Sequence, residues 1–359
     1  MSLEYLGWNS SLEEQFRQFQ SDGLVPARVA EEHKERYVIV SEQGEQTAEV
    51  TGKLRFTAQS RLDFPTVGDW VAVRTSKTEE LAVIIALLPR KTVFLRKTVG
   101  ETTEPQPVAA NVDTVLIVTD TGFDFSPRRM ERYLTLAYES GAEPVLVLNK
   151  ADLASDIDER IVTMEKVATG VPVLAVSAVT GAGFEKMEKY LAGGKTSTLV
   201  GSSGVGKSTI INRLLGEERI KTKEVREWDG RGRHTTTFRQ MILLPSGGIV
   251  IDTPGMKEIQ LWANEESLAG TFEDVEQLVL RCRFRDCTHG GEPGCAVCQG
   301  LEDGTLDEAR YESFLKLQKE LRYLEVRQNM SARLAEKAKW KKIHKKAKEI
   351  LRQKYGGRK

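Results

Sequence analysis

Short hydrophobic runs separated by turn residues dominate the first part of the chain. Residues 1–20 place apolar side chains at helical spacing, which predicts a short amphipathic helix. Across residues 23–89 the pattern changes to β-like runs, for example 36–40, 69–73 and 81–88. About five such strands predict a small β-barrel, of which the OB-fold is the common nucleic-acid-binding form. A structural barrel without a ligand is the alternative that the pattern leaves open.

Longer apolar runs alternate with helical segments from residue 111 onward. A continuous apolar run is typical of a parallel strand buried on both faces, and strands alternating with helices predict a doubly wound α/β sheet. After about residue 265 the strand signal ends, and a cysteine-rich stretch is followed by helical sequence. The predicted strands are 114–118, 144–148, 171–176, 198–200, 239–244 and 249–251, with helices at 127–140 and 156–169.

The composition excludes several classes of protein. Of 359 residues, 40% are hydrophobic and 29% are charged, so the chain is neither disordered nor fibrous. No apolar run approaches the roughly 20 residues that cross a bilayer. The first residues also lack the basic and apolar stretches of a secretory signal. We therefore expect a soluble, cytoplasmic and monomeric protein that has no membrane partner.

Positive charge is concentrated at the C-terminus. The chain has 52 Lys and Arg against 52 Asp and Glu, yet residues 331–359 hold 12 basic and two acidic side chains. This tail carries a net charge of +10, and the remaining residues carry −10. A basic end on an acidic body favours a polyanionic partner. A solvated helix face is the alternative.

A phosphate-binding motif directly follows a predicted strand and opens a helix. Its glycines let backbone N–H groups turn toward phosphates, and the helix N-terminus adds a favourable dipole. We expect Lys207 to bridge the β- and γ-phosphates during catalysis and Ser208 to bind Mg²⁺. The motif comprises Gly201, Ser202, Ser203, Gly204, Val205, Gly206, Lys207 and Ser208, and Thr209 follows it.

Residues at two other strand ends point to guanine as the base. The Asp152 carboxylate can accept from guanine N1–H and N2–H₂ together. Adenine would leave this carboxylate unpaired, which costs roughly 1–3 kcal/mol. Asn149 can bond to the other edge of the base, the Lys150 stem can cover the ring, and a backbone N–H can reach guanine O6. These residues are Asn149, Lys150 and Asp152 after one strand and Ser177 and Ala178 after the next.

Two further segments are predicted to respond to the γ-phosphate. Asp252 directly follows a strand and suits the outer shell of Mg²⁺, while the Gly255 N–H can contact the γ-phosphate. We favour Thr236 as the residue that closes over Mg²⁺ and the γ-phosphate. Its neighbours Thr235 and Thr237 remain alternatives.

The residue that orients the attacking water is not evident. Met256 stands where many GTPases place a water-orienting glutamine, and an apolar side chain cannot position water. The chemistry must use another group, the substrate phosphate itself or a group from a partner. His234 is the candidate because it lies beside the threonines and titrates near neutral pH. Packing or contact with RNA is its alternative role.

The order of these motifs is unusual. Both base-recognition segments, at 149 and 177, precede the phosphate loop at 201 and the aspartate at 252. Common GTPases have the phosphate loop first, so this order indicates a circular permutation. The segment after residue 252 therefore leads into the C-terminal region, which the nucleotide state could move.

All four cysteines lie between residues 282 and 298. Cys282, Cys287, His289 and Cys295 supply three thiolates and one imidazole, a complete tetrahedral set for one structural Zn²⁺ ion with no open position. Cys298 competes with Cys295 as the fourth ligand. Four unliganded cysteines are the alternative.

These motifs together resemble the RsgA (YjeQ) family of circularly permuted GTPases over nearly the whole chain. The resemblance extends to residues 106–113, before the first GTPase strand, and to each ligand position of the cysteine cluster. It implies a barrel with an N-terminal helix at 1–100, a permuted GTPase domain at 101–265 and a zinc-binding, basic helical domain at 266–359. It also implies slow GTP hydrolysis that the small ribosomal subunit stimulates, and rRNA as a partner.

Three other functions stay open at this point. A GTPase of the large subunit is one, although the barrel and the cysteine cluster argue against it. The second is a nucleotide-gated RNA-binding module in which hydrolysis is incidental, an idea that Met256 supports. The third is a divergent paralogue.

Overall fold

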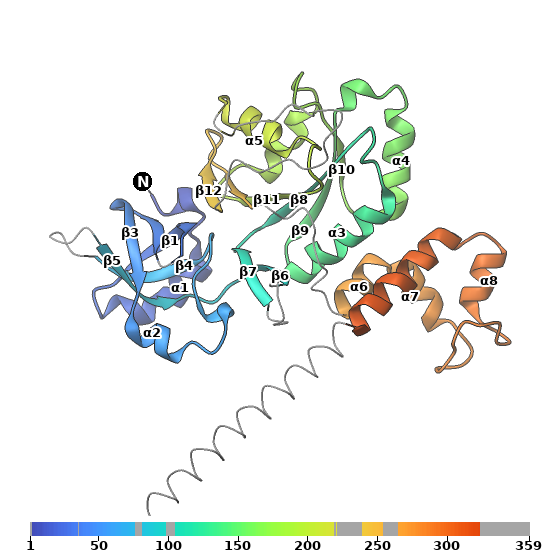
Figure 1. Ribbon diagram of the computed structural model, residues 1–359, viewed down its shortest axis with the longest axis horizontal. Helices are drawn as coiled ribbons and strands as arrows, with labels where there is room; N and C mark the ends of the chain where they lie inside the picture. Colours follow the sequence, from blue (N-terminus) through green and yellow to red (C-terminus); the bar gives the residue numbers. More distant parts are fainter. Residues whose placement is uncertain are drawn as a thin grey trace, which may run out of the picture.

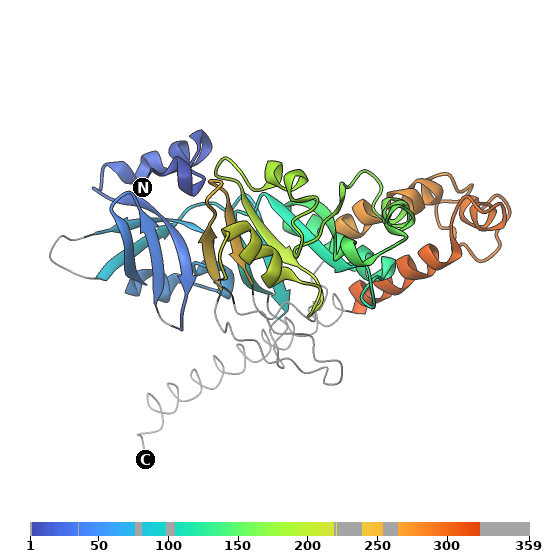
Figure 2. The same cartoon turned by 90° about the horizontal axis from the view of Figure 1, so that it is seen from above.

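Three units follow one another along the molecule in the order of the chain (Figures 1 and 2). The structure is a computed structural model that describes residues 2–34, 36–75, 81–97, 105–218, 220, 239–253 and 265–323. A β-barrel lies at one end, an α/β unit in the middle and a helical unit at the other end. Within these residues no helix is both long and apolar enough to cross a membrane.

The first unit is a closed five-stranded barrel. Its strands pair in the order β1-β2-β3-β5-β4, and β4 returns to β1; only β3 and β5 run parallel. Alternating side chains such as Ile39, Val71 and Ile84 fill the interior, so the predicted barrel is confirmed. The elements are η1 (Glu4–Leu6), α1 (Ser10–Gln20), β1 (Val25–Glu32), β2 (Tyr37–Ser41), β3 (Gly44–Val50), α2 (Gly52–Thr57), η2 (Arg61–Asp63), β4 (Trp70–Arg74) and β5 (Leu81–Leu87).

The predicted N-terminal helix is α1, and it packs outside the barrel. The Asn9 side chain caps it by accepting from the Leu12 N–H at 3.1 Å. Leu12 and Phe16 are buried in a cluster that includes Trp70 of β4. Amphipathic spacing therefore places the apolar face of α1 on the barrel wall.

The middle unit is a sheet with helices on both faces. Its strands lie in the order β10-β9-β8-β11-β13-β12, and all are parallel except β12. The α3 and α4 side chains pack on one face and those of α5 on the other, which confirms the predicted doubly wound sheet. The elements are β8 (Thr114–Asp120), α3 (Pro127–Ser140), β9 (Glu143–Asn149), η3 (Ala151–Leu153), α4 (Ile157–Val167), β10 (Val173–Ala175), η4 (Phe184–Lys186), η5 (Glu188–Tyr190), β11 (Thr196–Val200), α5 (Lys207–Leu215), β12 (Gln240–Leu243) and β13 (Ile249–Asp252).

The third unit is helical and packs against α3. It comprises α6 (Glu265–Thr271), α7 (Glu273–Leu280), α8 (Ala296–Glu302) and a helix over residues 308–323, which we call the 308–323 helix. Phe272 and Phe314 meet edge to face with ring centroids 5.5 Å apart. Their buried cluster is continuous with the α3 face of the central sheet, so the units share one core.

Two connections join the barrel to the central sheet. The hairpin of β6 (Val93–Lys97) and β7 (Pro105–Ala110) lies between them in sequence. In addition, β1 pairs with β12 through Glu31 and Gln240, so the barrel strands and the central strands form one hydrogen-bonded sheet.

A buried arginine holds the same junction. Arg28 of β1 donates to the carbonyls of Leu6, Gly68 (3.2 Å) and Asn111 (3.3 Å) and to the Thr196 hydroxyl of β11 at 2.8 Å. The side chain is 1% exposed. These acceptors come from four separate segments, so one guanidinium fixes all of them.

We expect Arg28→Met to lower the free energy of unfolding by about 3 kcal/mol, because each buried acceptor left without a donor costs about 1–3 kcal/mol. Urea unfolding measures the change. Arg74→Met, at the exposed end of β4, is the matched control and should stay near the wild-type value. Equal effects of the two substitutions would contradict a special role for Arg28.

Candidate nucleotide site and metal cluster

The phosphate loop lies between β11 and α5, and its glycines are required by geometry. Gly201 has φ +144° and Gly206 has φ +97°, values that favour glycine. A Cβ atom at Gly201 would lie 2.1 Å from the Val118 carbonyl oxygen, and one at Gly206 would lie 2.2 Å from Asn149 Nδ2. The loop therefore runs in contact with β8 and with the predicted base-recognition segment.

The helix that follows begins at the predicted phosphate-binding lysine. Lys207 Nζ donates to the carbonyl oxygens of Gly201 at 2.7 Å and Ser202 at 2.6 Å, so the ammonium group lies over the loop. Ser208 and Thr209 occupy the first turn of α5, whose N–H groups have no intrahelical partner. Ser203 and Gly204 are exposed and Val205 is buried. Exposed N–H groups beside a cation form an anion-binding site.

One buried amide ties three loops together. Asn149, at the end of β9, is 2% exposed. Its Nδ2 donates to the Val205 carbonyl of the phosphate loop at 2.8 Å, and its Oδ1 accepts from the Ala178 N–H at 3.1 Å. The structure thus brings the predicted base and phosphate segments together. The Ala178 N–H and one N–H of Asn149 Nδ2 therefore already have partners within the protein, which sequence reasoning did not anticipate.

The lysine next to this amide is held by an aspartate. Lys150 adopts a left-handed conformation with φ +60°, and its Nζ lies 2.8 Å from Asp120 Oδ2 at the end of β8. Asp120 Oδ1 accepts from the N–H groups of Gly122 and Asp124, both at 3.0 Å. Burial alone would raise the pKa of Asp120, but Lys150 and the two N–H groups outweigh it and lower that pKa.

The other residues predicted to recognise the base are Asp152 and Ser177. Asp152 is exposed in η3, two residues after Lys150. Ser177 is buried, and its hydroxyl accepts from the Thr180 N–H at 3.1 Å, which shapes the loop after β10.

A carboxylate lies beside the loop lysine. Asp252 ends β13. Burial raises the pKa of its carboxyl, and the nearby charge of Lys207 offsets only part of that rise. The predicted residues His234, Thr236 and Gly255 lie outside the described residues, as do Thr235, Thr237 and Met256.

Sequence reasoning missed two side chains at this site. Asp120 pairs with Lys150, and Arg129 of α3 donates to the Ser202 hydroxyl of the phosphate loop at 3.0 Å. For Asp120 a signal existed, since polar residues that end parallel strands gather at the ligand edge of a sheet. For Arg129 no local signal existed, because the contact depends on how α3 packs.

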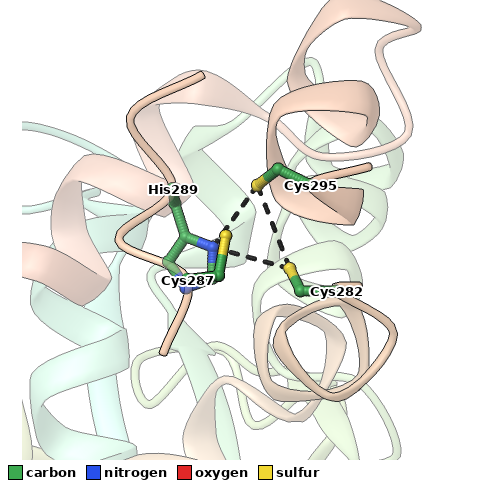
Figure 3. Close-up of side chains that lie close together, drawn as sticks. All are labelled: Cys282, Cys287, His289 and Cys295. Carbon is green, nitrogen blue, oxygen red and sulfur yellow. Dashed lines mark hydrogen bonds between the residues drawn. The ribbon is translucent and has the colours of Figure 1, made fainter. Parts of the chain in front are cut away.

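The predicted metal ligands lie together in the helical unit. Cys282 follows α7, Cys295 precedes α8, and Cys287 and His289 lie between them; the four side chains point toward one another (Figure 3). Their ligand atoms all lie within 4.8 Å of one another. Cys282 Sγ lies 3.9 Å from Cys295 Sγ and 3.6 Å from His289 Nδ1. A tetrahedral zinc ion with Zn–S bonds of about 2.3 Å places sulfur atoms about 3.8 Å apart, so the donor set fits.

Cys298 lies next to this cluster without joining it. Its thiol donates to the His289 backbone carbonyl at 3.4 Å, and its N–H donates to Cys295 Sγ at 3.4 Å. Burial of Cys295 opposes ionisation, but that N–H and His289 stabilise the thiolate and lower the pKa of Cys295 to about 6.

Comparison with known proteins agrees with this geometry. A family model described as RsgA GTPase matches residues 87–262. The chain is 46% identical over 354 residues to the small ribosomal subunit biogenesis GTPase RsgA of Opitutus terrae, covering 96% of each chain. It is 43% identical to the protein of the same name from Syntrophotalea carbinolica, covering 98% of this chain and 99% of that one.

Solved structures give the same result. The crystal structure of YjeQ from Thermotoga maritima matches with a TM-score of 0.63 at 31% identity, covering 83% of this chain and 98% of that chain. YloQ, described as a circularly permuted GTPase, matches with a TM-score of 0.60 at 23% identity, covering 83% and 95%, and supports the fold alone. Together with the relatives above, these matches show that the chain belongs to the RsgA GTPase family and is a GTP hydrolase with a circularly permuted nucleotide domain.

Proposed function

We propose that this GTPase acts in late assembly of the small ribosomal subunit, binding rRNA and hydrolysing GTP on the maturing particle. The proposal rests mainly on the two hydrogen bonds of Asn149. Its buried amide joins the loop after β9 to the loop after β10 and to the phosphate loop. Relatives that match nearly the whole chain are named for biogenesis of the small ribosomal subunit, which supports that subunit as the particle.

The base is the part of the substrate that distinguishes GTP. In this proposal Asp152 accepts from guanine N1–H and N2–H₂, and the second N–H of Asn149 Nδ2 reaches the other edge of the base. The Lys150 stem, fixed by Asp120, covers the ring. Ser177 and Ala178 close the pocket on the side of guanine O6.

The phosphates lie along the loop from Gly201 to Gly206. Lys207 moves from the loop carbonyls to the β- and γ-phosphates, because a phosphate oxygen is the stronger acceptor for an ammonium group. Ser208 and Thr236 are the proposed Mg²⁺ ligands, with Asp252 in the outer shell, and Gly255 contacts the γ-phosphate. The bound Mg²⁺ would neutralise charge on the phosphates.

Hydrolysis is slow in the isolated protein under this proposal. Met256 cannot orient water, and the candidate His234 acts only once a partner places it. The small subunit supplies that placement, so turnover depends on the particle.

RNA contacts are proposed for the barrel of domain 1–100 and for the zinc module and basic tail of domain 266–359. The GTPase domain at 101–265 lies between them, in a protein that is monomeric and cytoplasmic under this proposal. Arg281, Arg283 and Arg285 flank the first two cysteines, and all three are exposed. Residues 331–359 add a net charge of +10. Exposed cations neutralise phosphates, so binding should weaken steeply with salt. One Zn²⁺ ion holds the cysteine cluster in shape.

GTP turnover should rise about 10-fold or more when purified small subunits are added, because the partner completes the catalytic site. Phosphate release is measured with protein alone, with small subunits and with large subunits. Lys207→Ala is the matched variant and should lose the stimulated rate. Equal stimulation by both subunits, or none by either with normal GTP binding, would contradict the proposal and favour a nucleotide-gated RNA binder.

Asp120→Asn should raise the Kd of GTP and GDP by the same factor, about 10-fold, because one lost charge-assisted hydrogen bond is worth roughly 1.5–3 kcal/mol. Equal factors are expected since the change acts on the base segment and leaves the γ-phosphate contacts intact. Isothermal titration measures both constants. Asp158→Asn, on the exposed first turn of α4, is the control. A change confined to GTP would contradict base positioning.

Purified protein should contain one equivalent of zinc, and Cys282→Ser should lose it while Cys298→Ser keeps it. Metal binding contributes to folding, so removal should reduce hydrogen-exchange protection over 265–323 before the central sheet is affected. Elemental analysis and exchange mass spectrometry give the two readouts. Protection that survives verified metal removal would contradict a structural role, and loss of zinc in Cys298→Ser would contradict the ligand set.

A further inference from the structure

The cysteine cluster contains one thiol more than a tetrahedral zinc ion uses. Three cysteines and one histidine complete the ligand set, and Cys298 is left over. Its thiol donates to the backbone carbonyl of the ligand His289 at 3.4 Å, and its N–H donates to Sγ of the ligand Cys295 at 3.4 Å. The surplus thiol therefore lies directly against two residues of the metal site, although it is not itself one of the four ligands.

Cys295 and Cys298 have the spacing that a disulfide requires. Cys295 is the N-cap of α8, and the Gln299 N–H donates to its carbonyl at 3.2 Å, which closes the first helical turn over the pair. Residues three apart on such a turn have Cα atoms about 5 Å apart. A disulfide spans Cα separations of about 4.4–6.8 Å. Rotation of the Cys298 side chain from the His289 carbonyl toward Cys295 therefore allows an S–S bond to form.

Exposure indicates which sulfur an oxidant reaches first. Cys298 is partly exposed, whereas Cys295 is 5% exposed. Cys282 and Cys287 are partly exposed as well, but their sulfur atoms belong to the ligand set, in which a metal bond engages an electron pair of each sulfur. Cys298 thus combines access to solvent with a sulfur that the metal does not engage.

We propose that Cys295 and Cys298 form a reversible disulfide on exposure to peroxide, and that formation of this bond releases the zinc ion. The inference rests on the proposed zinc ligand set and adds to it a role for the thiol that the set leaves out. In a reducing compartment such a bond is transient and serves sensing rather than stability.

The chemistry takes two steps. Peroxide oxidises the Cys298 thiol to a sulfenic acid, and one water molecule is lost. The Cys295 thiolate then attacks the Cys298 sulfur, and the S–S bond forms as hydroxide leaves and is protonated to a second water molecule. Two electrons pass from the two sulfur atoms to one molecule of peroxide. A thiol reductant reverses the bond by exchange.

Loss of Cys295 as a ligand opens the metal site. The ligands that remain are Cys282, Cys287 and His289, and a structural zinc site uses four. Between Cys282 and Cys295 the chain forms neither helix nor strand, and Glu292 accepts from the Thr288 and Gly290 N–H groups at 2.8 and 2.7 Å. The shape of this segment therefore depends strongly on the metal.

Two of the proposed RNA-binding side chains lie on the same segment. Arg283 and Arg285 are exposed between the first two cysteines. Release of the metal loosens the backbone that positions both cations, so oxidation would weaken the RNA contact of this module until the thiols are reduced and zinc returns.

Zinc release from the full-length, zinc-loaded protein tests the proposal. Elemental analysis gives the zinc content before hydrogen peroxide is added, and a chromogenic chelator then follows the release. The wild-type protein should release zinc about 10-fold faster than Cys298→Ser, because that variant lacks the thiol that begins and completes the bond. Fragmentation of the tryptic peptide 286–310 should show Cys287 alkylated and Cys295 joined to Cys298. Dithiothreitol with added zinc should restore the metal content.

Matched variants separate the position of the thiol from the number of thiols. Cys298→Ser combined with Glu302→Cys keeps four cysteines, and Glu302 is exposed at the end of α8, about 10 Å along the helix from Cys295. This double variant should release zinc as slowly as Cys298→Ser. Cys298→Ala replaces Cys298→Ser where the serine variant folds poorly.

Three outcomes would overturn the proposal. The first is equal rates of peroxide-dependent release in the wild-type protein and in Cys298→Ser. The second is a disulfide that involves Cys282 or Cys287 in place of the Cys295–Cys298 bond. The third is a lack of zinc before peroxide is added, which in the wild-type protein would contradict the ligand set itself and in Cys298→Ser alone would make Cys298 a ligand.

Discussion

A single buried cation determines how the barrel sits on the nucleotide domain. The Arg28 guanidinium is fully buried, and burial lowers its pKa to about 10, so its charge is tolerated only while every acceptor is in place. Those acceptors are Leu6, Gly68, Asn111 and Thr196, from four separate segments. The barrel is therefore part of the same folded body as the central sheet, and the β1–β12 pairing extends that continuity through the backbone. Any partner that binds the barrel acts on a rigid extension of the nucleotide site.

The sequence predicted the elements whose pattern is local. Buried parallel strands are continuous apolar runs, so β8, β9 and β13 could be placed closely, and the phosphate loop needs glycines wherever it occurs. Contacts between distant segments could not be placed. An arginine in a strand pattern, such as Arg28, gives no local sign that it is buried. The two hydrogen bonds of Asn149 form only because the loops after β10 and β11 meet in the fold. The sequence thus named segments that the fold brings together, while tertiary packing determined which hydrogen bonds they make.

The cysteine cluster illustrates the same division. The spacing of Cys282, Cys287 and His289 predicted a ligand set, which either Cys295 or Cys298 could complete as far as the sequence shows. The fold distinguishes them, because α8 begins directly after Cys295 and turns the Cys298 N–H toward its sulfur. A helix N-terminus stabilises a thiolate placed before it, and the residue three positions later supplies the N–H. Cys298 therefore contributes its backbone to the site, and its thiol bonds to the His289 carbonyl.

Strand β11 is contacted at both of its ends by other parts of the molecule. This strand carries the phosphate loop and lies in the middle of the central sheet, between β8 and β13. At its first residue, Thr196, it is bonded to Arg28 of the barrel, and two residues beyond its end the Ser202 hydroxyl accepts from Arg129 of α3. The barrel thus contacts one end of the strand, and α3, which also packs against the helical unit, contacts the loop at the other end. The Arg28–Thr196 hydrogen bond is buried, so displacement of the barrel must break that bond or strain the strand that carries the phosphate loop. The barrel is therefore linked directly to the central strand of the nucleotide domain.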